Sequence, residues 1–350
     1  MTVIAIVEKI ISTHVLSAGE WTHLLENRTP EAEAYLLEAA RKCTDKVYGK
    51  EVFLRGLIEF TNFCKQDCYY CGIRCSNRTV TRYRLTEEEI LTCCRQGYEL
   101  GLRTFVLQGG EDAYFTETRI CRLVERIHKE FPDCAITLSV GEWKKESYER
   151  FFAAGAERYL LRQETSDEAH FGKLHPEKQT LSTRVECLKN LKEIGFQTGC
   201  GFLVGSPYQT TECIVKDLLF LQEFRPHMVG IGPFIPAANT PFEGEAAGSV
   251  SLTLFLLSCI RLMLPNVLLP ATTALASLGQ DGRIRGLMHG ANVIMPNLSP
   301  SSVRKHYALY DNKAASGTEA AEHKKELEAL LASKGFTTAI SRGDAPGFAK

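Results

Sequence analysis

The sequence has no long apolar run, no excess of charge and no basic leader. Its 350 residues carry 41 Lys and Arg against 42 Asp and Glu, a net charge of −1, so no summed field attracts nucleic acid or an anionic membrane surface. No segment reaches the about 18 uninterrupted apolar residues of a membrane-spanning helix, and residues 1–9 are not followed by a cleavage site. These absences predict a soluble, cytoplasmic protein with a small-molecule partner.

Internal repeats and low-complexity linkers are also missing, and His128, His170 and His175 do not have the spacing of metal ligands. Thirteen cysteines would suggest disulfides in a small secreted domain, but in a cytosolic chain of this size clustered cysteines are more often metal ligands. Four of them fall within residues 64–75, and none follows Cys259. Most of the others lie in apolar patterns, where a thiol behaves as a small hydrophobe: Cys43, Cys121, Cys187, Cys213 and Cys259.

Short apolar runs alternate with amphipathic stretches from residue 52 onward, as in successive strand-helix units. The predicted strands are residues 52–59, 104–108, 135–140, 158–162, 197–204, 228–233, 267–272 and 292–295. Helices are predicted between them, including 86–100, with a Thr86/Glu89 capping box, 117–129, 181–194, 212–224 and 251–264. Eight units predict an α/β fold, a complete (β/α)8 TIM barrel over residues 51–310, with chemistry at the C-terminal strand ends. A doubly wound open sheet is the competing fold.

Two helical segments are expected to flank the barrel. Residues 1–50 form a predicted N-terminal extension, in which Pro30 suits the first turn of a helix. Residues 311–350 are predicted to contain a charged helix over 316–334 and a turn-forming, mobile end.

Three of the clustered cysteines, Cys64, Cys68 and Cys71, have the spacing C-x3-C-x2-C in a loop after the first predicted strand. Iron-sulfur clusters are usually held by four cysteines, so three leave one iron open, and an open position is what a metal needs to bind a substrate. The amino and carboxylate groups of S-adenosylmethionine (SAM) can fill it. Zinc is the alternative, with Cys75 or a distant His as fourth ligand, but structural zinc sites favour paired C-x2-C knuckles and no second one is present. Cys75 is interpreted as a non-ligand.

This motif, with aromatic Tyr70 before the last cysteine, resembles that of the radical SAM superfamily. Further stretches between about residues 40 and 310 resemble the HydE-type maturases of FeFe-hydrogenase, a group similar to biotin synthase and to methylornithine synthase. They are VLQGGED at 106–112, LSVGEW at 138–143, RYLLRQET at 158–165, MVGIGPFIP at 228–236, PATT at 270–273 and GANVIMP at 290–296.

The resemblance implies an enzyme with SAM and one 4Fe-4S cluster, held by Cys64, Cys68 and Cys71 as the catalytic centre. It implies radical chemistry on a cysteine-bound iron carbonyl cyanide precursor during assembly of the hydrogenase diiron subcluster. Companion maturases and an electron donor such as ferredoxin or flavodoxin are the implied partners. Some members carry further cysteines near the C-terminus for a second cluster; because none follows Cys259, no second cluster is expected here.

Cofactor contacts also follow from the resemblance. Tyr70 is expected to pack against adenine, and the loop Gln108, Gly109, Gly110 and Glu111 to grip the methionyl amine of SAM. Ser139, Glu164 and Arg184 are implied as further SAM contacts. Taken without the cysteines, the glycine turn and Ser139 are ordinary structural features, and Arg184 is equally consistent with a solvated helix charge.

A polar cavity is predicted below the cofactor. Arg158, Arg162 and Glu164 share one strand face at period two, and charges inside a barrel must be paired or hold a charged ligand. The resemblance implies that Arg158, Arg162 and Thr137 face an anion-binding cavity; a structural ion-pair network or an outward-facing strand are the alternatives. The remaining expected lining residues are Thr272, Thr273, Met295 and Tyr307, although a Met is most often a core filler.

Two other functions remain open at this point. One is a radical SAM mutase or sulfur-chemistry enzyme of the methylornithine synthase or biotin synthase type, although the biotin synthase type needs an additional cluster whose ligands cannot be assigned. The other is a non-catalytic iron-sulfur scaffold, which does not need inward-facing Arg, Glu and Thr side chains.

Overall fold

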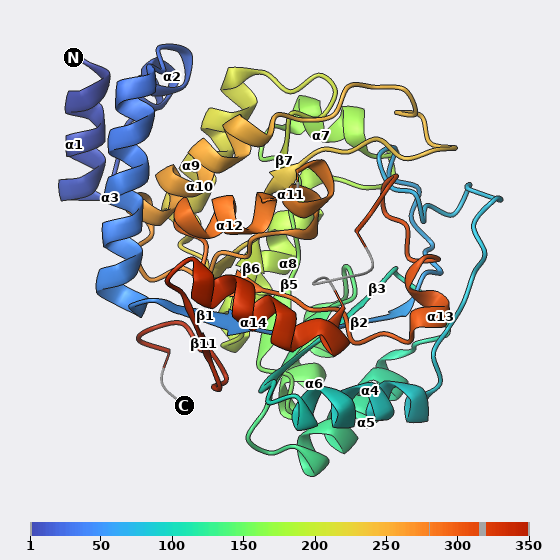
Figure 1. Ribbon diagram of the computed structural model, residues 1–350. Coiled ribbons are helices and arrows are strands. Elements are labelled where there is room, and N and C mark those ends of the chain that lie inside the picture. Colours follow the sequence, from blue (N-terminus) through green and yellow to red (C-terminus); the bar gives the residue numbers. More distant parts are fainter. Residues whose placement is uncertain (1, 280, 315–319, 349–350) are drawn as a thin grey trace.

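A ring of parallel strands surrounded by helices forms the centre of the computed structural model, which describes residues 2–279, 281–314 and 320–348 (Figure 1). Six strands pair in the order β2-β3-β4-β5-β6-β8, and every neighbouring pair is parallel. They are β2 (Gly56–Thr61), β3 (Thr104–Gly109), β4 (Ala135–Ser139), β5 (Arg158–Leu160), β6 (Gln197–Cys200) and β8 (Met228–Val229). The short strands β7 (Leu203–Val204) and β9 (Gly232–Pro233) continue β6 and β8 toward the C-terminal end of the barrel.

Backbone pairing closes this sheet into a barrel. Met228 forms a parallel bridge with Leu268, and Pro270 forms the next bridge with Val293 of β10 (Val293–Ile294). In turn, β10 pairs with β1 (Glu51–Leu54), which leads directly into β2. The predicted (β/α)8 barrel is therefore confirmed and the open sheet is excluded. The predicted strand 267–272 is present only as these bridges, because Pro270 has no N–H to donate to a ladder.

The predicted helices are present with small changes at their ends. The capping box of α4 is formed, since Thr86 and Glu89 each bond the other's backbone N–H. In chain order the helices of the barrel are α4 (Glu87–Glu99), α5 (Glu117–Glu130), α6 (Lys145–Ala153), α7 (Glu168–Leu174), α8 (Leu181–Ile194), α9 (Thr211–Phe224), α10 (Val250–Met263), α11 (Thr273–Leu278), α12 (Gly282–Met288) and α13 (Ser301–Arg304).

The N-terminal segment forms three helices on one side of the barrel, α1 (Val3–Thr13), α2 (Ala18–Glu26) and α3 (Pro30–Tyr48) (Figure 1). Helix α3 packs along α10, and α2 packs against α9. Trp21, Leu24 and Ile10 are fully buried in the same apolar core as the barrel helices. This burial stabilises the extension against the barrel.

The last residues of the C-terminal segment contact the end of the barrel opposite the strand C-termini, where Asp344 pairs with Arg158 at the start of β5. The predicted helix 316–334 is observed as a 3-10 turn (Ala321–His323) and α14 (Lys324–Ser333), whereas 315–319 lie outside the described residues. Strand β11 (Thr337–Ala339) then pairs with β1. The prediction of a mobile end is wrong for residues 341–348, because Ala345 is buried and the Gly343 carbonyl accepts a bond of 3.3 Å from Arg55.

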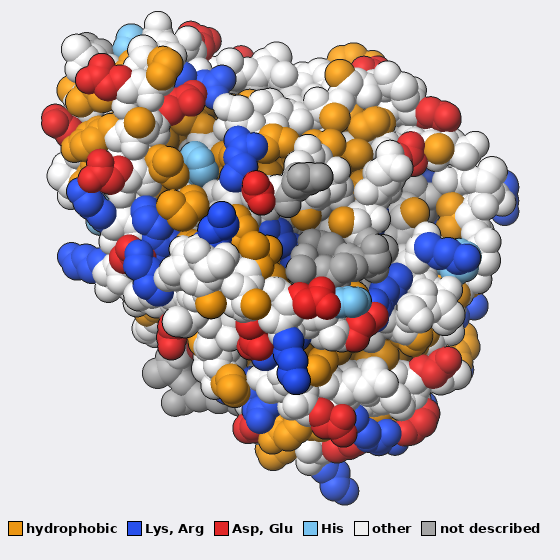
Figure 2. All heavy atoms as spheres, in the orientation of Figure 1, with side chains coloured by type: hydrophobic (Ala, Val, Ile, Leu, Met, Phe, Trp, Pro, Cys, Tyr) orange, Lys and Arg blue, Asp and Glu red, His pale blue; other side chains and the backbone are white. Residues whose placement is uncertain are grey.

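Charges of both signs are interspersed over the face shown in Figure 2, in keeping with the net charge of −1. Among the described residues, no helix combines the length and the apolar composition needed to cross a membrane.

Candidate active site

A cavity of about 330 Å³ lies at the C-terminal ends of the barrel strands. Its lining includes Cys64, Cys68 and Cys71 and all of the other residues predicted to bind the cofactor: Tyr70, Gln108, Gly109, Gly110, Glu111, Ser139, Glu164 and Arg184. Arg162, Thr272, Thr273, Met295 and Tyr307 line it as well. A larger groove, of about 820 Å³, lies outside the barrel between α4 and α13 and contains none of these residues.

The cysteine loop is held in place by bonds to its backbone. The guanidinium of Arg82 donates to the carbonyls of Ile73 (2.7 Å) and Arg74 (2.6 Å), and also to that of Asn62. The Asn62 amide in turn donates to the His306 carbonyl at 2.7 Å. These bonds fix the path of the loop.

Two glycines allow this loop to approach its neighbours closely. The Gly72 N–H donates to the Leu309 carbonyl at 2.8 Å, and a Cβ on Gly72 would overlap the Ala308 carbonyl oxygen. A Cβ on Gly110 would lie 2.8 Å from the Cβ of Cys64 and would also overlap the Phe63 carbonyl. Both positions therefore require glycine for steric reasons.

Burial controls the ionisation of the three thiols. It raises the pKa of Cys64, raises that of Cys68 to about 12 despite the opposing charge of Arg184, and raises that of Cys71 well above its usual value. In the metal-free protein these groups are thiols. Because a ligating cysteine is a thiolate, binding of iron must release their protons.

The arrangement of the thiols fits an iron-sulfur cluster. Within the described part of the chain, no three His, Cys, Asp or Glu side chains converge so as to hold a single metal ion. In a four-iron cluster each thiolate binds a different iron, so the three thiols do not have to meet at a single point. Cys75 is outside the cavity lining, and its N–H donates to the Gln66 carbonyl at 2.9 Å.

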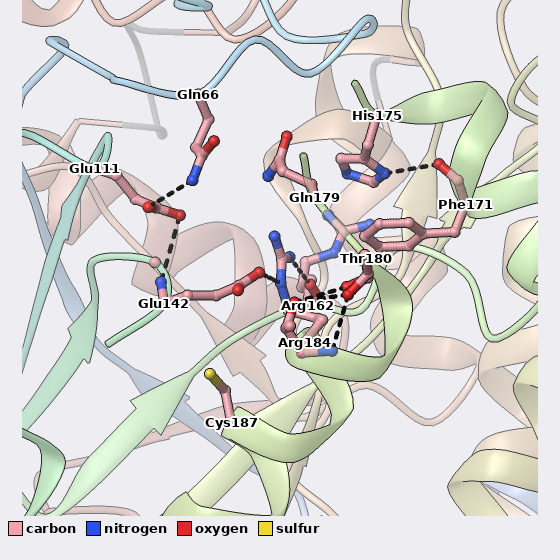
Figure 3. A network of polar contacts seen from close by, with 12 residues as sticks. Gln66, Glu111, Glu142, Arg162, Phe171, His175, Gln179, Thr180, Arg184 and Cys187 are labelled. Carbon is pink, nitrogen blue, oxygen red and sulfur yellow. Dashed lines mark hydrogen bonds and ion pairs between the residues drawn. The ribbon is translucent and has the colours of Figure 1, made fainter. Parts of the chain in front are cut away.

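Charged side chains follow β5 on the cavity wall. Arg162 lies 3.1 Å from Glu164, although this contact lacks hydrogen-bond geometry. Glu164 has a φ of 68°, a left-handed conformation that is strained for a residue with a Cβ. Burial raises the pKa of its carboxyl group, while Arg162 and Arg184 oppose that shift. Arg184 is itself paired with Glu142 and donates to the Arg162 carbonyl at 2.6 Å (Figure 3).

Several functional neighbours were not predicted from the sequence. Glu142 is one, and Gln66, which donates to Glu111 at 2.9 Å, is another (Figure 3). His175 lies 3.3 Å from the Tyr70 hydroxyl, and burial lowers its pKa to about 3. The neutral ring bonds the Phe171 carbonyl through Nδ1, which leaves Nε2 to accept from Tyr70. No local pattern signals these contacts, since they join different loops.

An ion pair at the base of the cavity was also missed. Glu59 of β2 is fully buried, and its carboxylate accepts from Lys313 and, at 2.8 Å, from Asn297. The reasoning applied to the predicted strand 158–162, that a charge inside a barrel must be paired, would have found this pair, since Glu59 is a lone carboxylate in the apolar run GLIEFT. Thr272 Oγ1, which also lines the cavity, is buried and has no hydrogen-bond partner among the residues that the structure describes.

Arg158 and Thr137 require a correction, since neither lines the cavity. Arg158 is fully buried at the N-terminal end of its strand, where it pairs with Asp344 at 2.7 Å and donates to the Arg342 carbonyl at 2.6 Å. Thr137 is its strand neighbour in register. The period-two pattern predicted the correct face of the strand but not the depth in the barrel, because Arg158 and Arg162 are four residue steps, or about 13 Å, apart along a strand. The alternative of a structural ion pair is the correct one for Arg158.

Comparison with known proteins agrees with this geometry. The model of the radical SAM superfamily matches residues 58–221, which contain the three cysteines and the Gly-rich loop. The chain is 45% identical to the FeFe hydrogenase maturase subunit HydE of Thermotoga maritima, over 79% of each protein. The chain belongs to the radical SAM superfamily, and HydE is its homologue. Enzymes of this superfamily use a 4Fe-4S cluster and SAM.

A second activity occurs among the relatives of this chain. The 3-methylornithine synthase of Methanosarcina barkeri is 32% identical over 87% of this chain and 86% of its own. A crystal structure of methylornithine synthase superimposes with a TM-score of 0.85 at 31% identity, covering 95% of this chain and 97% of the other. These likenesses confirm the barrel and the predicted enzyme class, and they exclude the non-catalytic scaffold.

Proposed function

We propose that Cys64, Cys68 and Cys71 hold one 4Fe-4S cluster with an iron open to SAM, and that the enzyme acts in the assembly of the FeFe-hydrogenase diiron subcluster. The observation that supports the proposal is the position of three half-buried thiols, the Gln108–Glu111 loop and a set of paired charges around one barrel cavity. When bound, the reduced cluster supplies the electron that breaks a carbon–sulfur bond of SAM and releases a 5′-deoxyadenosyl radical. A second cluster is not part of the proposal.

Three of the residues that line the cavity suit the polar groups and the adenine of SAM. Glu164 offers a buried carboxylate to an ammonium or ribose hydroxyl group, and Arg184 a guanidinium to the SAM carboxylate. The Arg184–Glu142 pair keeps that guanidinium oriented before SAM arrives. The hydrogen bond to His175 fixes the ring of Tyr70, which is then in place to pack against adenine.

The lower cavity suits a small anionic or cyanide-bearing substrate. Arg162 Nε and Thr272 Oγ1 are buried and have no hydrogen-bond partner in the described part of the chain, so a bound acceptor would satisfy both. Thr273 and Met295 complete this part of the lining. Together with the likeness to HydE, these donors support a cysteine-bound iron carbonyl cyanide precursor as the substrate, with companion maturases and a ferredoxin or flavodoxin as partners.

A methylornithine synthase-type mutase is the second candidate. It is favoured by the TM-score of 0.85 over nearly the whole of both chains. The maturase is preferred, because the identity to HydE is 45% against 32% for the synthase.

The cluster assignment is tested by reconstituting the protein anaerobically with iron and sulfide, reducing it with dithionite and adding SAM. We expect 5′-deoxyadenosine from the wild type and from Cys75→Ala, but neither cluster iron nor 5′-deoxyadenosine from Cys68→Ala. Full cluster iron in Cys68→Ala would contradict the assignment.

The substrate is tested separately with the same preparation. Added to apo-hydrogenase with the companion maturases, the wild type is expected to restore hydrogenase activity, while the Cys68→Ala variant is not. Formation of 3-methylornithine from an amino-acid mixture, without hydrogenase activation, would instead establish the mutase.

A further inference from the structure

The side chain of Gln179 contacts a cysteine of the proposed cluster site. Gln179 lies in the turn before α8, where its N–H donates to the Pro176 carbonyl at 2.9 Å. Its side chain is 8% exposed and lines the cavity. The amide oxygen Oε1 lies 3.6 Å from Cys68 Sγ, so in the metal-free protein the thiol donates to this oxygen.

The other end of the same amide has no partner among the described residues. Nε2 of Gln179 is buried and makes no hydrogen bond to any of them, and Figure 3 shows no bond from it to the residues around it. A buried N–H without an acceptor is destabilising, and most buried polar groups in native proteins have a partner, so this N–H is available to an acceptor that enters the cavity. Neighbouring His175 already bonds Phe171 and Tyr70, so it does not take this N–H.

Binding of iron reverses the hydrogen-bonding role of the sulfur. A ligating Cys68 is a thiolate, which has no proton to donate and accepts hydrogen bonds. The carbonyl end of Gln179 would then face a negative sulfur. Half a turn about the last side-chain torsion, which is broad and nearly two-fold, exchanges Oε1 for Nε2 with little movement of the chain.

We propose that, in the cluster-bound enzyme, Gln179 donates an N–H to the sulfur of Cys68 and so raises the reduction potential of the cluster. The inference rests on the proposed ligation by Cys68. Reduction adds negative charge to the cluster and its sulfur ligands, so a donated hydrogen bond stabilises the reduced state more than the oxidised one. Cys64 accepts a comparable bond from the backbone N–H of Gln66 (3.4 Å), but Gln179 supplies its donor from a side chain and can be replaced.

The test is a redox titration of reconstituted protein without SAM. The electron paramagnetic resonance signal of the reduced cluster is measured at each potential. Gln179→Leu and Gln179→Met retain most of the side-chain volume and remove the donor. We expect both to have a more negative midpoint potential, with a reduced-to-oxidised ratio at fixed potential about three- to tenfold lower; tenfold corresponds to about 59 mV for one electron. Lys178→Leu, an exposed change in the same turn, should leave the potential unaltered.

An unchanged midpoint potential in both Gln179 variants would overturn the inference. Iron and sulfide content separates this failure from that of the proposed function. If the wild type takes up no cluster, the ligation by Cys68 is wrong; if all proteins carry the cluster at the same potential, only the role of Gln179 is wrong. A variant with lower iron content still gives a midpoint potential, because the resonance signal arises only from chains that carry the cluster.

Discussion

Replacing Asp344 by Asn tests the role assigned to the C-terminal residues under the barrel. Asp344 pairs with Arg158 at 2.7 Å and accepts from Gln197 at 2.5 Å. Burial alone would raise the pKa of its carboxyl group, but the charge and hydrogen bond of Arg158 outweigh burial and lower it to about 2, from 3.8. Arg158 is fully buried, so in Asp344→Asn its charge remains inside the barrel without a carboxylate partner.

The expected loss of stability follows from the pKa shift. The difference between a pKa of 3.8 in the unfolded chain and about 2 in the folded protein corresponds to about 2 kcal/mol at neutral pH. Breaking a fully buried pair costs about 3–5 kcal/mol. Because the Asp344 side chain is 31% exposed, we expect a loss of about 2–3 kcal/mol in the free energy of unfolding.

Urea unfolding of the metal-free proteins at pH 7 measures this loss. Asp133→Asn is a matched control, since Asp133 pairs with Arg103 at 2.9 Å but is 50% exposed, and its loss should cost less than about 1 kcal/mol. Equal urea midpoints for Asp344→Asn and the wild type would refute the account of the barrel base.

The same variant predicts a pH dependence. A carboxyl group whose pKa is lower in the folded state stabilises the protein above its unfolded pKa and loses that effect as the pH falls through the folded value. The stability difference between wild type and Asp344→Asn should therefore be complete above about pH 5 and shrink between about pH 4 and pH 2. A difference that grows on acidification would contradict the assignment of the pair.

Three further substitutions test the cavity. Gly110→Ala should lower cluster iron, because the new Cβ would lie 2.8 Å from Cys64, whereas Gly172→Ala, with open space around its Cβ, should not. Arg162→Ala should leave cluster iron unchanged and weaken binding of the substrate or of small anions, measured by calorimetry; unchanged binding would make Arg162 structural. Lys313→Met should destabilise the protein by about 3–5 kcal/mol in urea, since Glu59 is left as a fully buried, unpaired carboxylate.

The barrel and the cysteine site were predictable because their signals are local. The strand periods and the C-x3-C-x2-C spacing lie within short stretches of sequence, and the structure places the predicted cofactor residues around one cavity. The predicted seventh strand, residues 267–272, was too long because Pro270 has no N–H to donate to a ladder. The apolar pattern of these residues does not indicate that missing donor.

What the sequence did not predict depends on contacts between distant segments. Asp344 reaches Arg158 across 186 positions, and Lys313 reaches Glu59 across 254. Glu142, which pairs with Arg184, and Gln179 give no periodic signal, since each lies in a loop whose path is set by the packing of the barrel. Which side chains form these contacts is determined by the folded barrel, and no single stretch of the sequence predicts it.

Electron paramagnetic resonance of the reduced, reconstituted protein with and without SAM tests the central claim most directly. If three cysteines leave an iron of the cluster open inside the cavity, SAM binds that iron and changes the g values of the signal, and Cys68→Ala gives no such signal. A cluster signal that SAM leaves unchanged, or cysteines found bound to a single zinc ion, would contradict the account.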